Sequence, residues 1–479
     1  MNIGLATTRS ALRYPERTAV FQGDDHLTWR QLDERSNRLA NLLVEKYSLE
    51  TGDRVVLWAP NRLHVPEILA GVAKAGMVYV GLNFRMTDKE LLKVFENSEP
   101  RVLIVDGEYI ARADVLAKSL NAEVLNLDDA SQCDYEEILA EASFCEPKSL
   151  YQIRPEDDFC IIYTSGTTGT PKDVWFDHGR VLQHAAIAAL EYEISCETRY
   201  LTAIPHNSSV HITLVPCMML GAAIGFIDSR GFDAHAYADE VQRVRAAHSY
   251  LVPTQIYRLL DAVSDRNALA SIKTLGYGAA PMSPDKAGQL IERFGPIFTQ
   301  LYGMAEIASI GTILRKSDHL AAVNGQLELL NSVGQSSYSM CVRVLNANGN
   351  NLSSDDKGEI IFSAPYMMKG YFRDKARTES TLVNGWVHSG DVGRFDENGY
   401  LYVVDRLKDL IIRGGYNIAP AEIEAALHRH PDVLEVGVIG RPDEIWGESV
   451  VAVVALKSGS AVDEGSLLQW CRDNTELAH

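Results

Sequence analysis

Hydrophobic residues in the first hundred positions switch between helical and strand-like spacing. Residues 27–47 carry leucines at helical spacing behind Thr28, whose side chain can cap the start of a helix. A mostly apolar run at 54–58 follows a Gly-Asp turn, as expected of a buried strand. The pattern then predicts a helix at 65–75, a strand at 77–82, a helix at 88–96 and a strand at 101–105. This alternation indicates an α/β fold with a doubly wound, mostly parallel sheet.

The same alternation of strand and helix returns after residue 158. The predicted strands lie at 159–163, 222–227, 249–252 and 272–277. The predicted helices lie at 179–191, 234–247, 255–263 and 284–294. The amino-terminal part of the chain is therefore expected to contain two related βα arrays.

The pattern changes at about residue 333, where short alternating strands and Asn-Gly turns begin. Strands at 341–345, 359–362 and 400–404 predict an antiparallel β subdomain. Beyond a charged stretch at 405–409, the pattern predicts a small α/β unit with helices at 420–427 and 466–471 and strands at 433–439 and 450–456. We therefore expect a large domain over 1–404, a hinge at 405–409 and an incomplete C-terminal domain over 410–479.

A loop rich in hydroxyl groups leaves the predicted strand at 159–163. Its sequence from Tyr163 to Lys172 is Tyr-Thr-Ser-Gly-Thr-Thr-Gly-Thr-Pro-Lys. Hydroxyl donors, glycine N–H groups and a lysine together suit a polyphosphate. The spacing differs from the GxxxxGK[ST] loop of nucleotide triphosphatases. A Ser/Thr/Gly linker is the alternative, but the position between two apolar stretches favours a phosphate loop.

Composition limits the possible partners and the compartment. Lys and Arg number 45 and Asp and Glu 64, so the net charge of −19 opposes binding to nucleic acid or anionic lipid. The seven cysteines are scattered without a CxxC pair, which predicts reduced thiols in a cytoplasmic protein without a zinc site. No secretory signal or transmembrane segment is expected. His178 and His184 are expected to be surface or hydrogen-bonded side chains, and Asp128 part of a solvated turn.

The loop at 163–172 resembles the phosphate loop of the adenylate-forming enzymes, which include acyl-CoA and aryl-CoA synthetases, luciferases and adenylation domains of peptide synthetases. This resemblance makes Lys172 catalytic. It assigns phosphate binding to Thr164, Ser165, Gly166, Thr167, Thr168 and Gly169.

Two short segments further along the chain resemble motifs of the same family. Residues 300–306, Gln-Leu-Tyr-Gly-Met-Ala-Glu, imply that Tyr302 contacts the adenine and that Glu306 is catalytic and binds Mg²⁺. Residues 388–391, His-Ser-Gly-Asp, imply that Asp391 accepts hydrogen bonds from the ribose. Each segment alone also fits an ordinary loop or turn.

A longer segment at 405–424 resembles the family motif that joins the two domains. The resemblance implies that Arg406 contacts the nucleotide and that Lys408 is the hinge residue. It also places Gly414 and Gly415 beside coenzyme A in a second domain orientation. Four motifs in the family's order identify the chain as a member.

The family's chemistry implies the substrates and cofactors. A small carboxylic acid attacks the α-phosphate of ATP, and the acyl-adenylate then passes to the thiol of coenzyme A. ATP, Mg²⁺ and coenzyme A are therefore the expected cofactors, and a homodimer is compatible with the sequence.

The chain departs from the family pattern in three places. Asp173 replaces the glycine that usually follows the loop lysine, and we expect its carboxylate to point to water. Ala305 replaces a threonine that contacts phosphate. The chain ends at His479, before the segment that carries the family's second catalytic lysine. We therefore expect a C-terminal truncation, and activity of this chain stays open.

The acid-binding side of the site is predicted from two segments. His206 and Asn207 lie where family members place side chains that gate the acyl tunnel, and an amide can pair with a ring substituent. An incidental turn is the alternative. The segment Gly278-Ala279-Ala280 resembles the family's GGAP loop beside the adenine and the acyl group. The His-Asn pair, together with Ala305 and a residue other than glycine after Lys172, is similar to members that activate aryl acids, so we expect an aryl or other compact acid.

Other functions stay open at this point. The first is an aliphatic acyl-CoA synthetase, and the second is an adenylation domain that loads a carrier protein. The third, based on the three departures, is an adenylate-binding protein without turnover.

Overall fold

A computed structural model describes residues 1–479 except 129–133, 165–170, 281, 414–415, 444–445 and 475–479. The chain divides into two compact units. The first contains residues 1–341 and 363–387, and the second contains residues 342–362 and 388–479. The predicted boundary at 405–409 falls inside the second unit, so the hinge stays a prediction about motion.

One sheet of the first unit has seven strands in the order β18-β8-β7-β4-β3-β5-β6. Strands β3 to β7 pair in parallel, whereas β8 is antiparallel to β7. The central strands are almost wholly apolar because helices cover both faces of a parallel sheet. The bounds are β3 Arg54–Trp58, β4 Val78–Gly81, β5 Val102–Val105, β6 Glu123–Asn126, β7 Asp158–Thr164, β8 Lys172–Asp177 and β18 Gly370–Tyr371.

The other sheet of this unit has nine strands in the order β15-β14-β13-β12-β11-β9-β10-β1-β2. Its centre, from β13 to β1, is parallel, and β14 returns antiparallel to β13. The bounds are β1 Thr18–Gln22, β2 Asp25–Thr28, β9 Arg199–Thr202, β10 Ala223–Phe226, β11 His248–Leu251, β12 Thr274–Gly278, β13 Phe298–Tyr302, β14 Thr312–Leu314 and β15 Gln335–Ser336.

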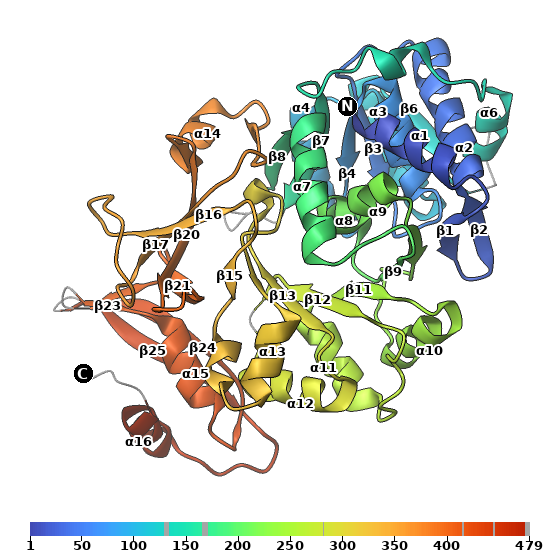
Figure 1. The fold of residues 1–479 in the computed structure, drawn as a ribbon. Helices are drawn as coiled ribbons and strands as arrows, with labels where there is room; N and C mark the ends of the chain where they lie inside the picture. The colour runs from blue at the N-terminus through green and yellow to red at the C-terminus, as the bar shows by residue number, and fades with distance from the viewer. Residues whose placement is uncertain (129–133, 165–170, 281, 414–415, 444–445, 475–479) are drawn as a thin grey trace. The chain divides into compact units, whose positions relative to one another are not determined.

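Helices of the first unit begin where the sequence offers caps. Thr28 and Gln31 form a capping box at the start of α2, and Thr87 and Glu90 form another at α4. The helices α11, α12 and α13 lie beside strands β11 to β13 (Figure 1). The bounds are α1 Ile3–Arg13, α2 Trp29–Asn41, α3 Val65–Ala75, α4 Asp88–Ser98, α5 Ile110–Leu120, α6 Tyr135–Glu141, α7 His178–Glu191, α8 His206–Ser209, α9 Val215–Leu220, α10 Ala234–Val244, α11 Pro253–Ala262, α12 Pro284–Phe294, α13 Lys316–Val323 and α14 Lys375–Thr381.

The second unit is built mainly from antiparallel strands. In β20 and β21 Asp391 lies opposite Arg406. A four-stranded sheet in the order β23-β22-β25-β24 carries α15 and α16. The bounds are β16 Cys341–Leu345, β17 Gly358–Ser363, β20 Trp386–Phe395, β21 Leu401–Arg406, β22 Ile411–Arg413, β23 Tyr416–Ile418, α15 Pro420–His428, β24 Val433–Asp443, β25 Gly447–Leu456 and α16 Glu464–Asn474. The short strand β19, Leu382–Val383, belongs to the first unit.

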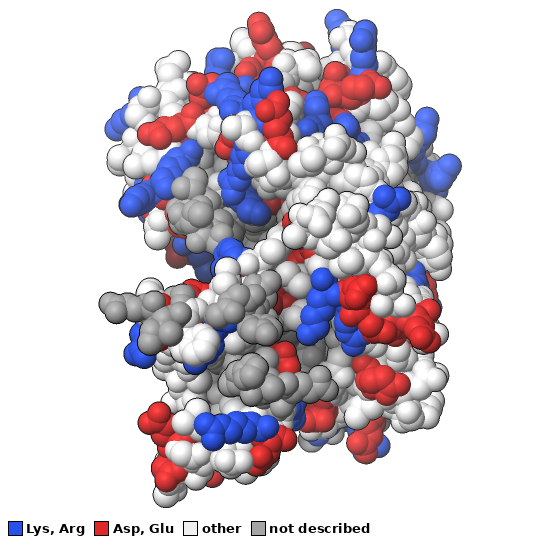
Figure 2. Space-filling view, turned by 90° about the vertical axis from the view of Figure 1, so that its left-hand side faces the viewer, with Lys and Arg blue, Asp and Glu red and all other residues white. Residues whose placement is uncertain are grey.

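The expected α/β fold with a smaller C-terminal part is confirmed. Basic and acidic side chains are interspersed on the face shown in Figure 2, so the net negative charge of the chain is not gathered there into one field. A search of the described residues finds no helix long and apolar enough to cross a membrane.

Candidate functional site

Three side chains that are far apart in the sequence meet in the first unit. The Lys172 ammonium donates a hydrogen bond to Oε1 of Glu306 at 2.7 Å. The Tyr371 hydroxyl donates to the same oxygen at 2.6 Å. Glu306 is 2% exposed, whereas 28% of the Lys172 side chain remains accessible. A cation and a carboxylate in one place are the groups that bind the phosphates and the Mg²⁺ of a nucleotide.

The strand pairs around this cluster explain its geometry. Thr164, at the end of β7, lies opposite Lys172, at the start of β8, so the two ends of the predicted phosphate loop are adjacent. Glu306 lies in a short 3-10 helix directly after β13. In open α/β sheets, ligands bind at the carboxyl ends of parallel strands. The loop ends and Lys172 belong to the seven-stranded sheet and Glu306 follows β13 of the nine-stranded sheet, so strand ends of both sheets bring the lysine and the glutamate together.

Backbone conformation fixes the turn that carries Glu306. A Cβ at Gly303 would lie 2.6 Å from the carbonyl oxygen of Ser309, so only glycine fits there. Ala308 and Ser309 both adopt positive φ, at 58° and 83°, which costs conformational energy for residues with a Cβ. Strain of this kind concentrates at functional sites.

Asp173 does not behave as predicted. Its exposure is 7%, and its carboxylate accepts a hydrogen bond from Nδ2 of Asn97, so the prediction that it points to water was wrong. Successive side chains of a strand point to opposite faces. The Asp173 carboxylate therefore lies on the face of β8 opposite to Lys172. Burial raises the pKa of Asp173.

Tyr371 was not identified as a site residue from the sequence. Its strand, β18, pairs antiparallel with β8 and places Tyr371 opposite Val174. Burial, together with the neighbouring Glu306 carboxylate, raises the pKa of the Tyr371 hydroxyl, so the hydroxyl stays protonated and donates its hydrogen. This contact depends on the pairing of Tyr371 with Val174, which lies 197 positions earlier in the chain, and no local pattern reveals it.

His206 and Asn207 have different roles at the start of α8. The Nε2 atom of His206 lies 3.0 Å from the Ala59 carbonyl oxygen and its Nδ1 atom lies 2.8 Å from the Tyr79 hydroxyl. Burial lowers the pKa of His206 to about 4, so the ring is neutral, donates to Ala59 and accepts from Tyr79. Both ring nitrogens are thus used inside the protein. Asn207 is 5% exposed, and its Oδ1 atom has no hydrogen bond to the described residues.

The segment after β12 combines a required glycine with a strained alanine. A Cβ at Gly278 would lie 2.4 Å from the carbonyl oxygen of Leu301, on the neighbouring strand β13. Ala279 has a φ of 67° and, like Ala280, is exposed. Together these features present the backbone of 278–280 at the carboxyl edge of the sheet, beside β13 and Tyr302. Tyr302 itself is half-buried.

The second unit holds the other two predicted nucleotide contacts. Nε of Arg406 lies 3.4 Å from Oδ1 of Asp391. The Asp391 N–H donates to the Ser389 hydroxyl at 3.0 Å, and this hydroxyl donates to the Ile360 carbonyl at 2.6 Å. Gly390 adopts a φ of 72°, the left-handed conformation that glycine tolerates. Ser389 therefore orients the segment that carries Asp391.

The remaining predicted site residues are only partly described. Lys408 lies in an exposed turn at 407–409 directly after β21, which suits a hinge. The predicted phosphate contacts at 165–169 and the coenzyme A contacts Gly414 and Gly415 lie outside the described residues.

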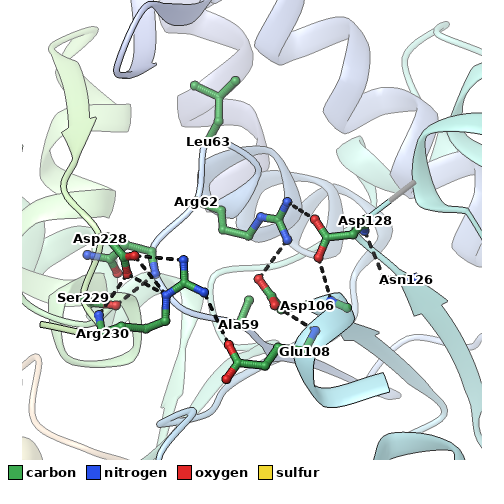
Figure 3. Close-up of polar contacts among 12 residues, drawn as sticks. Ala59, Arg62, Leu63, Asp106, Glu108, Asn126, Asp128, Asp228, Ser229 and Arg230 are labelled. Atoms are coloured by element: carbon green, nitrogen blue, oxygen red, sulfur yellow. Dashed lines mark hydrogen bonds and ion pairs between the residues drawn. The ribbon is translucent and has the colours of Figure 1, made fainter. Parts of the chain in front are cut away.

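The prediction of a surface or hydrogen-bonded side chain was wrong for His184, whereas His178 has a hydrogen bond, as predicted. His184 is 0% exposed, and neither of its ring nitrogens has a hydrogen bond to the described residues. His178 is equally buried, although its Nδ1 atom accepts a hydrogen bond from the Ile3 N–H at 3.3 Å. Asp128 is not merely solvated, because it accepts hydrogen bonds from Arg62 at 2.6 Å and from the Gly107 N–H at 2.7 Å (Figure 3).

Comparisons with known proteins agree with this geometry. Residues 7–372 match the model of the AMP-binding enzyme family, and residues 422–478 match that of the AMP-binding enzyme C-terminal domain. A feruloyl-CoA synthase from Amycolatopsis sp. is 35% identical, covering 99% of this chain and 92% of the relative. A 2-succinylbenzoate–CoA ligase from Bacillus licheniformis is 31% identical, covering 96% of this chain and 90% of the relative.

Solved structures give the same result. ATP-bound MatB from Rhodopseudomonas palustris has a TM-score of 0.88 at 26% identity, covering 99% of this chain and 92% of that chain. The o-succinylbenzoate CoA synthetase MenE from Bacillus subtilis, in complex with its acyl-adenylate intermediate, has a TM-score of 0.85 at 27% identity, covering 98% of this chain and 91% of that chain.

The chain therefore belongs to the AMP-binding enzyme family. It is an AMP-forming acid–thiol ligase that uses ATP, and the expected C-terminal domain is present.

Proposed function

We propose that this protein activates an aromatic carboxylic acid with ATP and transfers the acyl group to coenzyme A. In the first step the carboxylate attacks the α-phosphate, and pyrophosphate leaves. In the second step the thiol of coenzyme A attacks the acyl carbon, and AMP leaves. The observation that carries the proposal is the hydrogen-bonded cluster of Lys172, Glu306 and Tyr371.

Lys172 and Glu306 have complementary roles in the first step. The Lys172 ammonium stabilises the negative charge that develops on the phosphate oxygens during the attack. The Glu306 carboxylate would hold Mg²⁺, which supplies further positive charge beside the phosphates. Tyr371 keeps the Glu306 carboxylate in position by donating to Oε1. The loop at 164–169 would add hydroxyl and N–H donors.

The other predicted site residues complete the substrate contacts. Tyr302, with Gly278, Ala279 and Ala280, would border the adenine and the acyl group. In the second unit, Asp391 and Arg406 would bind the ribose and the nucleotide. Lys408 would be the hinge, and Gly414 and Gly415 would lie beside coenzyme A in the second step.

The preference for an aromatic acid is supported by two observations. Asn207 is buried, and its Oδ1 acceptor has no hydrogen bond to the described residues, which suits a polar substituent on a compact acid. Relatives include a feruloyl-CoA synthase and 2-succinylbenzoate–CoA ligases. A medium/long-chain fatty acid–CoA ligase from Mycobacterium tuberculosis is also 31% identical, so aliphatic acids belong in the test. The scattered cysteines support a cytoplasmic location, and a homodimer is testable by light scattering.

The test is formation of CoA thioester from ATP, coenzyme A and a panel of aromatic and aliphatic acids. We expect AMP release and thioester formation, with kcat/KM at least about tenfold higher for aromatic acids. Higher values for fatty acids would contradict the substrate class. Loading of a carrier protein but not of coenzyme A would identify a carrier-loading adenylation domain. No acid-dependent AMP release with any acid would identify a binding protein without turnover.

A further inference from the structure

A row of buried polar side chains lies close to the candidate site in the first unit. His211 follows Asn207 by one helical turn, so both side chains lie on the same side of α8 and the π-helix at Val210–Leu214. The ring of His184, on α7, lies 5.8 Å from the His211 ring and 5.4 Å from the Tyr366 ring, measured between centroids. These four side chains are between 0% and 6% exposed.

The polar atoms of this row lack hydrogen bonds within the described part of the chain. This holds for Oδ1 of Asn207, both ring nitrogens of His184 and of His211, and the Tyr366 hydroxyl. His184 faces the backbone of His211, and Tyr366 faces the Ser337 hydroxyl, but neither pair reaches hydrogen-bond geometry. A buried polar atom without a partner costs about 1–3 kcal/mol. Such a row is expected where a ligand or water completes the hydrogen bonds.

The row is connected to the Lys172 cluster through the backbone. Two residues after Tyr366, the Met368 N–H donates a hydrogen bond to the carbonyl oxygen of Glu306 at 2.9 Å. The other end of the row begins at Asn207, in the predicted acid-binding segment. An acid bound in the predicted acid-binding segment, with its carboxylate towards Lys172, would therefore have the row beside the end that is opposite to its carboxylate.

The electrostatics of the row favour an uncharged group. Burial, with the second imidazole beside it, lowers the pKa of His184. Burial lowers the pKa of His211 to about 3. Both rings are therefore neutral at pH 7, and each offers one donor and one acceptor. A hydroxyl group matches this arrangement, because it donates one hydrogen bond and accepts others, whereas a second carboxylate would require positive charge.

We propose that His184, His211 and Tyr366 bind a hydroxyl group on the ring of the aromatic acid. This inference rests on the proposed function and makes these residues determinants of substrate specificity. The Asn207 amide provides a further acceptor along the row.

The test compares acids that differ by one hydroxyl, namely 4-hydroxycinnamate with cinnamate and 4-hydroxybenzoate with benzoate. Wild-type protein should show a KM at least about tenfold lower for the hydroxylated member of one pair, since one hydrogen bond contributes roughly that factor. His184→Leu and His211→Leu should remove this preference by raising the KM of the hydroxylated acid alone. Tyr366→Phe removes a single oxygen, and it should weaken the preference even if the histidine variants fold poorly.

His248→Leu is the matched control. His248 is 2% exposed, and its ring nitrogens also lack hydrogen bonds to the described residues. It lies at the amino end of β11, away from the edge where parallel strands bind ligands. This variant should keep the wild-type preference and the wild-type KM for ATP.

The outcomes separate the two proposals. Turnover without a preference for hydroxylated acids, or with a preference that all row variants retain, would mean that the row holds only water and would overturn this inference alone. No acid-dependent turnover by the wild-type protein would overturn the proposed function and this inference with it.

Discussion

Two clusters of polar side chains in the first unit are stabilised to very different degrees. Around the ends of β3, β5 and β10, Arg62 pairs with Asp106 at 2.8 Å and with Asp128 at 2.6 Å (Figure 3). Nearby, Arg230 pairs with Asp228 at 2.8 Å and with Glu108 at 3.3 Å. We call these six residues the paired network. The row of Asn207, His211, His184 and Tyr366 has buried polar atoms without such partners.

The difference distinguishes groups that stabilise the fold from groups that are available to a substrate. In the paired network each cation meets two carboxylates, so little hydrogen-bonding capacity remains for a ligand. In the row, no hydrogen bond from the described residues offsets the cost of burying the polar atoms. Functional sites commonly reduce the stability of the fold, because their groups are arranged for a ligand and not for contacts within the protein. Changes in the two clusters should therefore have opposite effects on stability and on substrate preference.

The largest expected effect on stability is that of Arg62→Leu. This change leaves the carboxylate of Asp106, which is 7% exposed, without its cation. The free energy of unfolding should fall by about 3 kcal/mol, measured by urea denaturation. The preference among acids should not change.

Arg230→Leu is the control for this prediction. The Arg230 side chain is 53% exposed, so its pairs should contribute at most about 1 kcal/mol. Equal losses of unfolding free energy in Arg62→Leu and Arg230→Leu would show that burial does not determine how much each ion pair stabilises the protein.

The second-largest expected effect is the loss of unfolding free energy that His184 and His211 cause when the pH falls. A folded-state pKa of about 3 for His211, and a lowered pKa for His184, mean that only the unfolded state binds these protons between pH 6.5 and about 4. Stability therefore falls as the pH falls through this range. Between pH 7.5 and 5.5 the wild type should lose about 2–3 kcal/mol more than the double variant His184→Leu/His211→Leu.

Asp128, in the paired network, stays ionised in this range. The hydrogen bond from Arg62 holds the pKa of Asp128 below its usual value. The contribution of the Arg62–Asp128 pair to the free energy of unfolding is therefore lost only at pH values below about 4. Arg62→Leu should accordingly show the wild-type pH dependence between pH 7.5 and 5.5. If the free energy of unfolding of His184→Leu/His211→Leu also showed the wild-type pH dependence, the loss of stability in acid would not come from His184 and His211.

The smallest effect concerns the row at neutral pH. Replacing both imidazoles by leucine removes buried polar atoms that have no hydrogen bond to the described residues, and it puts apolar side chains in their place. The free energy of unfolding of His184→Leu/His211→Leu at pH 7.5 should stay within about 1 kcal/mol of the wild type or rise. A loss above about 3 kcal/mol would show that the imidazoles already have strong partners within the protein.

Much of the fold could be predicted because hydrophobic spacing is a local signal. The helix predicted at 65–75 and the strand predicted at 54–58 have the same bounds as α3 and β3. The Thr28 cap is present. The first helix, α1, was not predicted, because its buried face includes Thr7, Thr8 and Ser10 and therefore lacks a clear apolar stripe.

The candidate site was predictable where a motif carries it and not where tertiary pairing creates it. Lys172 and Glu306 were named from their motifs, and the structure brings them within 2.7 Å. Tyr371 contacts Glu306 only because β18 pairs with β8. The burial of His184 likewise depends on packing against His211 and Tyr366, which lie in other segments.

The most direct test of the central claim is acid-dependent exchange of pyrophosphate into ATP, measured with the wild type and with Lys172→Met. We expect exchange to require an aromatic acid and to fall at least about 100-fold in Lys172→Met, because one charge-stabilising donor is removed. Lys369→Met is the matched control, since Lys369 pairs with Asp158 at 2.6 Å rather than with Glu306, and it should exchange at the wild-type rate. Undiminished exchange by Lys172→Met would contradict the account.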